Sequence, residues 1–209
     1  MARQMDIDKS VHDFQWTRNW HRLRNLSTFR DFVYPQWHGK PITMLEIGCF
    51  EAQSTVWCMQ YLLTHPDSRM VSCDPWLQTT KLSSEFMEDV MYRAVHNIEP
   101  YRDRCQFVRG NSAEVLRRMI RKGYAGITKK SVDLCMIDGG HHALGVLDDC
   151  RLCLKLVKSG GWMLLDDVEN DKDKGLDHVK GGLSMFLEES GDKVKRVFKY
   201  KYMEGYEVI

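Results

Sequence analysis

From residue 41 onward, short apolar runs alternate with longer segments of helical periodicity. Five runs of apolar and β-branched residues predict strands, at 41–47, 69–73, 105–108, 132–137 and 162–165. Each is followed by a segment that predicts a helix, at 54–63, 85–98, 113–121, 146–157 and 175–189. Such β–α alternation is typical of an α/β domain with a parallel sheet and helices on both faces.

The clearest unit runs from Val132 to Val168, with one strand on either side of an amphipathic helix. The apolar stripe of that helix recurs at i, i+4, i+7, i+8 and i+11 from Val146, and Gly160-Gly161 predicts its C-terminal stop. This length predicts a right-handed crossover between parallel strands. After the fifth unit, strands at 194–202 and 206–209 predict a hairpin around Glu204-Gly205. We therefore expect a mostly parallel seven-stranded sheet that ends in an antiparallel hairpin.

Residues 1–40 are aromatic and basic, and we expect them to form a helical layer packed on a core domain at 41–209. Ser27 or Thr28 could cap a short helix that stops before Pro35. The layer could close over a pocket, pack on the sheet or form a homo-oligomer. Interleaved aromatic and basic residues can also bind single-stranded nucleic acid, but an amphipathic helix that buries its aromatic face explains the pattern more simply.

The composition of the chain bears on its localisation and on the partners it can bind. The chain has 209 residues and a net charge of +1, so nothing draws it strongly to nucleic acid or an anionic membrane. No apolar run approaches the roughly 20 residues of a membrane span, and residues 1–14 lack the apolar core of a signal peptide. The seven cysteines lie mostly in apolar patterns, which predicts buried thiols and a cytoplasmic protein. The Cys150-x-x-Cys153 pair lies mid-helix without a second pair, which argues against zinc.

Acidic residues follow several predicted strands. Asp138 ends the fourth strand, Asp166 and Asp167 end the fifth, and His141 and His142 lie in the loop after Asp138. Ligands of open α/β sheets bind beyond the carboxyl ends of the strands, so these side chains are candidates for a functional site.

The first strand ends in a tight turn with a single glycine, Gly48, rather than the three of a dinucleotide fingerprint. Glu46 before it would repel a phosphate and favour a ligand with positive charge. Asp74 ends the second strand and could accept hydrogen bonds from both ribose hydroxyls, or else cap a helix before Pro75. Asn111 and Ser112, after the third strand, would line an adenine.

These motifs together resemble one enzyme family. The stretches LEIGCFEAQSTVW, CDPW, HNI, RGNSAEVL and Asp133–Val168, with its IDGxH loop and Asp-Asp pair, resemble a class I S-adenosylmethionine-dependent methyltransferase. The similarity is greatest to the small-molecule O-methyltransferase branch and covers roughly residues 40–190. One departure is Ala52, where the family has its second glycine.

The resemblance implies a Rossmann-like fold and a binding site for S-adenosylmethionine. It implies that Glu46 and Gly48 hold the methionine end, Asp74 the ribose and Ser112 the adenine side. The full predicted cofactor-binding set is Glu46, Gly48, Phe50, Ser54, Asp74, Trp76, Asn111, Ser112 and Asp138.

The resemblance also implies a divalent ion. Metal-dependent members hold it on acids after the fourth and fifth strands, here Asp138, Asp166 and Asp167, and hard oxygen ligands suit Mg²⁺. The alternative is that Asp166 and Asp167 cap the next helix or face solvent. His141 is the candidate catalytic base together with Asp138, and His142 is the alternative base.

The predicted function is S-adenosylmethionine-dependent O-methylation of a small hydroxylated molecule, assisted by a divalent metal. Two alternatives stay open: metal-independent transfer to another nucleophile, including RNA, and a binding module without turnover. We expect a small-molecule acceptor as partner, rather than a membrane or a nucleic acid.

Overall fold

The computed structural model describes residues 5–19, 21, 24–78, 82–169 and 178–209. It contains a seven-stranded sheet in the order β3-β2-β1-β4-β5-β7-β6. The strands are β1 Thr43–Ile47, β2 Arg69–Asp74, β3 Cys105–Arg109, β4 Val132–Ile137, β5 Val157–Leu165, β6 Val194–Tyr200 and β7 Met203–Val208. Strands β1 to β5 pair in parallel, and β7 is antiparallel to both β5 and β6. This confirms the predicted sheet and its C-terminal hairpin.

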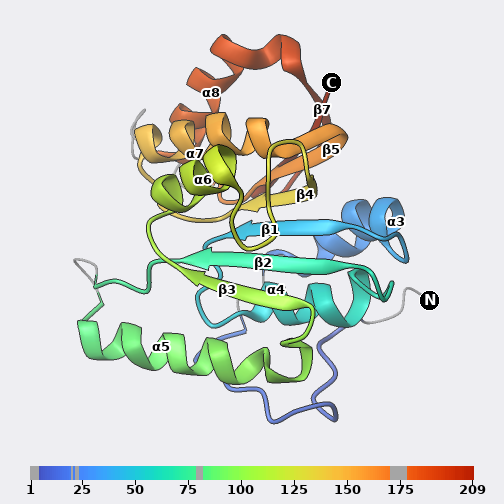
Figure 1. Ribbon diagram of the computed structural model, residues 1–209, viewed down its shortest axis with the longest axis vertical. Coiled ribbons are helices and arrows are strands. Elements are labelled where there is room, and N and C mark those ends of the chain that lie inside the picture. The colour runs from blue at the N-terminus through green and yellow to red at the C-terminus, as the bar shows by residue number, and fades with distance from the viewer. Residues whose placement is uncertain (1–4, 20, 22–23, 79–81, 170–177) are drawn as a thin grey trace.

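Helices cover both faces of the sheet (Figure 1). One layer holds α2 Leu26–Thr28, η1 Phe29–Val33, α3 Tyr34–Trp37, α4 Gln53–Trp57, η2 Cys58–Leu62 and α5 Ser84–Asn97. The other holds α6 Ser112–Lys122, α7 Ala143–Leu156 and α8 Val179–Ser190. Short 3₁₀ turns, η3 Glu99–Tyr101 and η4 Gly191–Lys193, follow α5 and α8.

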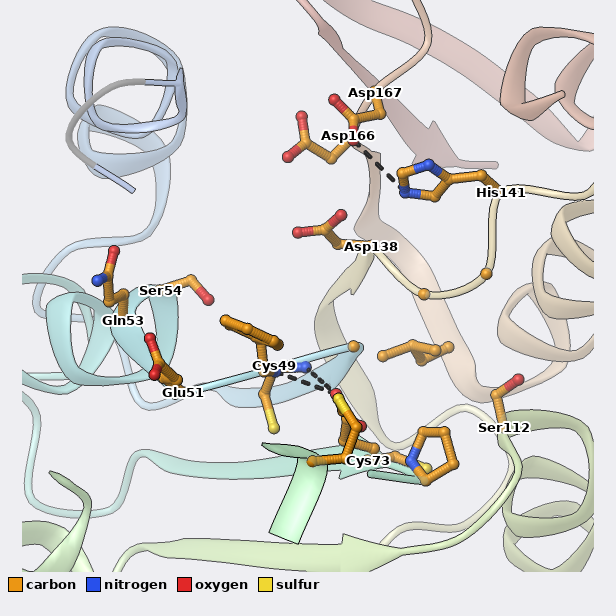
Figure 2. A pocket seen from close by; sticks show the side chains of 18 of the residues that line it. Cys49, Glu51, Gln53, Ser54, Cys73, Ser112, Asp138, His141, Asp166 and Asp167 are labelled. Atoms are coloured by element: carbon orange, nitrogen blue, oxygen red, sulfur yellow. Dashed lines mark hydrogen bonds and ion pairs between the residues drawn. The ribbon is translucent and has the colours of Figure 1, made fainter. Parts of the chain in front are cut away.

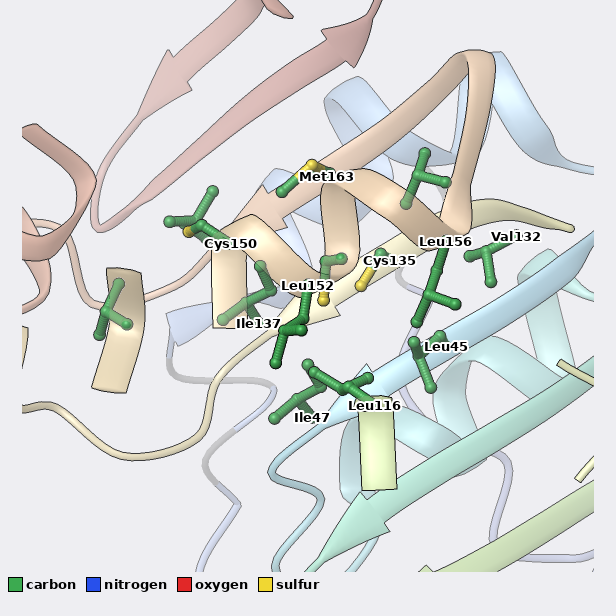
Figure 3. Close-up of a cluster of buried hydrophobic side chains, with 14 of the residues drawn as sticks. Leu45, Ile47, Leu116, Val132, Cys135, Ile137, Cys150, Leu152, Leu156 and Met163 are labelled. Atoms are coloured by element: carbon green, nitrogen blue, oxygen red, sulfur yellow. The ribbon is translucent and has the colours of Figure 1, made fainter. Parts of the chain in front are cut away.

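Successive side chains of a strand point to opposite faces of the sheet. The buried apolar side chains therefore form two clusters, one under each helical layer. In β1, Leu45 and Ile47 belong to the buried cluster under α6 and α7, whereas Met44 belongs to the cluster under the opposite layer. Figure 3 shows the first of these clusters, where Leu116 of α6 meets the β1 side chains. Strands that are apolar on both faces are expected for a parallel sheet covered by helices.

The order of the strands determines where a ligand can bind. From β1 the chain proceeds outward to β2 and β3, then returns to place β4 on the other side of β1. The loops that leave β1 and β4 therefore diverge to opposite faces and leave a crevice between them, at the topological switch point of the sheet. Gly48 and Asp138 are the first residues after these two strands.

Two sequence predictions about glycines are wrong. Helix α7 ends at Leu156, and Gly160 and Gly161 lie inside β5, where a Cβ on Gly161 would come 2.9 Å from the Asp133 carbonyl oxygen. The β6–β7 turn lies at 201–202, while Gly205 lies within β7, where a Cβ would meet the Phe198 ring at 2.2 Å. At Gly161 and Gly205, neighbouring atoms pack too closely for a side chain. The sequence alone does not distinguish a glycine required by such packing from a glycine required by a turn.

The predicted stop before Pro35 is also wrong, because the helical segment continues to Trp37. A run of π-helical turns, η1, precedes the proline, and Pro35 lies at the start of α3 where its missing N–H is tolerated. The start predicted at Gly175 for the last helix falls outside the described residues. All seven cysteines are buried free thiols, as predicted. Within the described ranges, no helix is both long and apolar enough to span a bilayer.

Candidate functional site

A cavity of about 1060 Å³ lies at the carboxyl ends of β1, β2, β4 and β5. The loops after these strands contribute Gly48, Asp74, Asp138 and Asp166 to its wall. Figure 2 shows these loops converging, with the acidic residues after β4 and β5 on one side and the first turn opposite. A volume near the upper end of the range for small-ligand pockets can hold a nucleoside-sized molecule together with a second, smaller one.

The turn after β1 has an unusual backbone. Gly48, Phe50 and Ala52 all have positive φ, at 81°, 48° and 64°. A Cβ on Gly48 would lie 1.9 Å from the carbonyl oxygen of Asp138, so no other residue fits there. Ala52 takes the left-handed conformation at the position where the family has glycine, and it directly precedes α4. The turn thus brings the β1 and β4 loops into backbone contact.

Asp74, the last residue of β2, stabilises this turn through hydrogen bonds to its backbone. Its Oδ2 accepts hydrogen bonds of 3.0 Å from the amides of Cys49 and Phe50, and its Oδ1 accepts one of 2.8 Å from the amide of Trp76. The carboxylate lies at the cavity wall but caps no helix, since α5 begins only at Ser84. Burial raises its pKa, and the three amides act in the opposite direction. Its predicted bond to a ribose would use the lone-pair sites that remain.

Glu46 lies behind the turn and outside the cavity wall. It is fully buried and accepts hydrogen bonds from the hydroxyls of Ser54, Thr55 and Ser72. Burial raises the pKa of Glu46, and those hydroxyls oppose the shift. Its predicted contact with a methionine ammonium stays a prediction, while the observed partners show that it holds α4 against β1 and β2.

Three aspartates converge after β4 and β5, and we call Asp138, Asp166 and Asp167 the carboxylate cluster. Ligand atoms of Asp138, Asp167 and His141 all lie within 4.8 Å of one another. Asp166 is 4% exposed; its Oδ2 accepts a 2.8 Å hydrogen bond from Asn25 Nδ2, and its Oδ1 has no partner among the described residues. Neither Asp166 nor Asp167 caps a helix, since the next described helix begins at Val179.

Burial and neighbouring negative charges raise the pKa values of Asp138 and Asp166. Burial is the main cause that raises the pKa of Asp138 well above its ordinary value, and the neighbouring charges of Asp166, Asp167 and Glu46 add to it. Burial and Asp167 raise the pKa of Asp166 to about 6. The guanidinium of Arg24 lies 2.5 Å from Asp167 Oδ1 and partly balances these charges. A bound cation would relieve this repulsion.

His141 reaches the cluster from the loop after Asp138. Its Nε2 lies 3.4 Å from Asp167 Oδ2, and its side chain is half exposed at the cavity wall (Figure 2). His142 is the residue before α7 and does not line the cavity. The geometry therefore favours His141 over His142 as the residue available to a ligand.

The other predicted cofactor residues divide into two groups. Phe50, Ser54, Asn111 and Ser112 line the cavity, and Asn111 caps α6 by accepting from the Ala113 amide at 3.0 Å. Trp76 does not line the cavity; it is buried, and its Nε1 donates to the carbonyl of Phe50 at 2.9 Å. Its position supports the first turn from behind.

Sequence reasoning missed two parts of the wall. The N-terminal region supplies Thr17, Arg18, His21, Arg24 and Asn25, so it does close over a pocket, one of the options its pattern left open. Helix α7 supplies Asp149, whose carboxyl accepts from Ser112 and whose pKa burial raises to about 6. The sequence indicates only weakly that Asp149 lines a site, since most acidic residues within an amphipathic helix face solvent.

Comparison with known proteins agrees with the fold. A family model described as a methyltransferase domain matches residues 45–168, more than half of the chain. The chain therefore belongs to this methyltransferase family, and it is a class I, S-adenosylmethionine-dependent methyltransferase by fold and family. No curated protein matches it in sequence.

Solved structures share the fold at low identity. The O-methyltransferase TomG of Streptomyces achromogenes, in complex with SAM, is 21% identical with a TM-score of 0.52, over 79% of this chain and 72% of that one. The mycinamycin-pathway methyltransferase MycE, in complex with Mg, SAH and mycinamycin VI, is 16% identical with a TM-score of 0.58. That match covers 99% of this chain but 55% of MycE, so the chain spans about half of MycE's length. A protein of Corynebacterium glutamicum is 12% identical with a TM-score of 0.61, over 84% and 76% of the two chains.

Proposed function

We propose that this methyltransferase transfers the methyl group of S-adenosylmethionine to an oxygen of a small hydroxylated molecule, with a divalent ion held by the carboxylate cluster. The observation that carries the proposal is that side-chain oxygen or nitrogen atoms of Asp138, His141 and Asp167 lie within 4.8 Å of one another at the wall of the cavity. Structurally similar methyltransferases include one solved with Mg and SAH, which supports the same pairing of ion and cofactor.

The residues of the first turn fit the methyl donor. Gly48 lets the β1 turn pack against the backbone of the β4 loop at the cavity wall, where no side chain would fit between them. The acidic wall formed by Asp138, Asp166 and Asp167 favours the positive charge of a sulfonium. When bound, S-adenosylmethionine supplies the activated methyl group.

The carboxylate cluster fits a hard divalent ion. Carboxylate oxygens and one imidazole converge within 4.8 Å, and Asp166 offers a buried oxygen that lacks a hydrogen-bond partner among the described residues. Asp138 and Asp167 would hold the ion through carboxylate oxygens, with Asp166 as a further oxygen ligand or the acceptor of a bond from bound water, so that the imidazole of His141 stays available as a base. When bound, a divalent ion lowers the pKa of an acceptor hydroxyl.

His141 is suited to accept the proton of that hydroxyl. With Nε2–H directed to Asp167 Oδ2, the lone pair of the neutral imidazole is on Nδ1. Asp167 then fixes the tautomer and stabilises the charged imidazolium after proton transfer. Arg24 and Asn25 bond Asp167 and Asp166 and line the cavity together with Thr17, where they would limit water and orient the acceptor.

One observation favours a second candidate, metal-independent transfer. The guanidinium of Arg24 already neutralises Asp167 and lies where it could bind an acceptor oxygenated at two positions. In that scheme Arg24 and His141 would act without an ion. The two candidates differ in their response to chelation.

The test is transfer of labelled methyl from S-adenosylmethionine to a panel of phenols, catechols and hydroxylated sugars, with and without EDTA. We expect transfer that EDTA abolishes and Mg²⁺ restores, a loss of at least about 100-fold in His141→Ala, and near-normal activity in the control His142→Ala. Transfer that resists EDTA would support the Arg24 scheme. Methylation of nitrogen acceptors alone, or no transfer to any hydroxyl, would contradict the proposal.

A further inference from the structure

The segment of residues 5–19 lies along α4 and α5 and is held by hydrogen bonds to the backbone. Trp57 Nε1 donates to the carbonyl of Met5 at 2.7 Å, and Gln60 exchanges hydrogen bonds with the backbone of Asp8. Further along, the side chain of Asn97 bonds both the amide and the carbonyl of Gln15 at 2.7 Å. These contacts fix the course of a segment that has no regular secondary structure of its own.

Between these two anchor points, three metal-ligating side chains meet away from the cavity. His12 comes from the segment, His96 from the last turn of α5 and Glu99 from η3. One ligand atom from each lies within 4.8 Å of the other two. The two imidazole rings are in contact, with centroids 4.4 Å apart and planes tilted by 41°.

The hydrogen bonds of the histidines leave lone pairs available. His96 Nε2 lies 2.8 Å from the carbonyl oxygen of Asp13, which can only accept, so Nε2 carries the proton and Nδ1 the lone pair. A second ring nitrogen bonded to a backbone carbonyl is the usual support of a metal-ligating histidine. His12 Nε2 is buried with no hydrogen-bond partner among the described residues. Glu99 is exposed and free to adjust its carboxylate.

We propose that His12, His96 and Glu99 form a site for a zinc-type ion, separate from the carboxylate cluster. Two imidazoles and one carboxylate suit Zn²⁺, which takes such ligands at about 2.0–2.1 Å, with water as the fourth. Tetrahedral ligands at that distance are about 3.4 Å apart, so the three side chains close in slightly on binding. The oxygen-rich carboxylate cluster prefers a harder ion such as Mg²⁺.

The ion would join the N-terminal segment to α5 at a point five residues before Thr17. Thr17 and Arg18 line the cavity, and Thr17 is itself bonded through its amide to Glu51 Oε2 at 2.9 Å. Binding at His12 would therefore stabilise the wall that this segment contributes. The site needs no catalytic step, so its test does not depend on the proposed reaction.

The test uses the full chain, stripped of metal, with Asp167→Asn as background so that the carboxylate cluster does not contribute. Titration calorimetry with Zn²⁺ should show one ion per chain, and Co²⁺ should give the intense visible absorption of a tetrahedral complex. His12→Ala and Glu99→Gln should each weaken Zn²⁺ binding by at least tenfold. His65→Ala is the matched control: His65 also lies beside an acid, Asp67 at 3.8 Å, but no third ligand joins them among the described residues. The His65→Ala variant should bind Zn²⁺ with the same affinity as the background protein.

Trypsin gives a second readout, because Lys9 and Arg18 are exposed on either side of His12. Zn²⁺ should slow cleavage at both sites in the background protein and leave the rate unchanged in Glu99→Gln. Glu99 is exposed, so this variant keeps the fold even if His12→Ala does not. Equal Zn²⁺ affinity in the background and in Glu99→Gln, an octahedral Co²⁺ spectrum, or cleavage rates indifferent to Zn²⁺ would overturn the proposal.

Discussion

Gly48 packs so closely on Asp138 that a Cβ at position 48 would lie 1.9 Å from the Asp138 carbonyl oxygen. The amide of Asp138 in turn donates to the carbonyl of Ile47 at 2.8 Å. This contact joins the turn expected to hold the methyl donor to the loop that carries the carboxylate cluster and His141. The spacing between donor and acceptor sites therefore depends on one glycine.

Gly48→Ala should damage both stability and cofactor binding. The methyl group forces the β1 and β4 loops apart, and φ of 81° is strained for any other residue, so we expect a loss of more than about 2 kcal/mol in the free energy of unfolding. Calorimetry with S-adenosylhomocysteine should show binding weakened at least tenfold. Gly191→Ala is the control, since nothing lies within 4 Å of its added Cβ and its φ is −64°. If both variants bind alike, the close contact has no functional role.

Ala52→Gly should be nearly neutral, unlike a typical alanine-to-glycine change. Ala52 is buried at φ 64°, and relief of left-handed strain of about 1–2 kcal/mol offsets the lost methyl burial and the added chain entropy. Ala94→Gly, at a buried helical position near the end of α5, has no strain to relieve and should lose about 1–2 kcal/mol. Urea unfolding of the two variants measures the difference. Equal losses would show that the Ala52 conformation carries no strain.

Sequence reasoning recovered the fold because its evidence is local. Apolar runs and turn residues mark β1 to β5, and the family motifs mark Gly48, Asp74 and Asp138. It could not recover side-chain partners. Glu46 meets Ser72 from a different strand, and Asn25 reaches Asp166 across 141 positions. Gly205 looks like a turn residue until its packing on Phe198 is known. Such contacts depend on tertiary packing, which no local pattern encodes.

Arg24→Gln should tighten binding of a divalent ion. The Arg24 guanidinium neutralises Asp167, so its removal leaves the carboxylate cluster more negative and raises the affinity for Mn²⁺ severalfold. Titration of Mn²⁺ followed by electron paramagnetic resonance measures this affinity. Arg30→Gln removes a comparable guanidinium paired with Asp31 at the surface and should have no effect. Unchanged Mn²⁺ affinity with loss of methyl transfer would instead favour Arg24 as a direct participant in a metal-free reaction.

His21 should make the protein less stable in mild acid. Burial lowers its pKa to about 3 from 6.5, so between these values the unfolded chain binds a proton that the folded chain does not. Stability is therefore lost as pH falls from about 6.5 toward 3, at up to about 1.4 kcal/mol per pH unit. Both ring nitrogens lack hydrogen-bond partners in the described part of the chain, and Phe29 and Trp57 pack against the ring.

His21→Phe keeps the aromatic packing and removes the titrating group. Its free energy of unfolding should fall less between pH 6.5 and 4.5 than that of the wild type, measured by urea unfolding at several pH values. Asp149 and Asp166, with pKa values near 6, are present in both proteins and cancel in the comparison. Parallel pH profiles for the two proteins would contradict the assignment of His21 as a buried neutral imidazole.

We expect the methyl donor and a divalent ion to bind side by side in the cavity. The most direct test is nuclear magnetic resonance of S-adenosylmethionine labelled with ¹³C at the methyl group and bound to the protein with Mg²⁺ or Mn²⁺. We predict that paramagnetic Mn²⁺ broadens the bound methyl signal strongly in the wild type, and that Asp138→Asn removes the broadening while the control Asp148→Asn, on the exposed part of α7, retains it. A bound methyl signal that stays sharp with Mn²⁺ in the wild type, or no bound signal at all, would contradict the account.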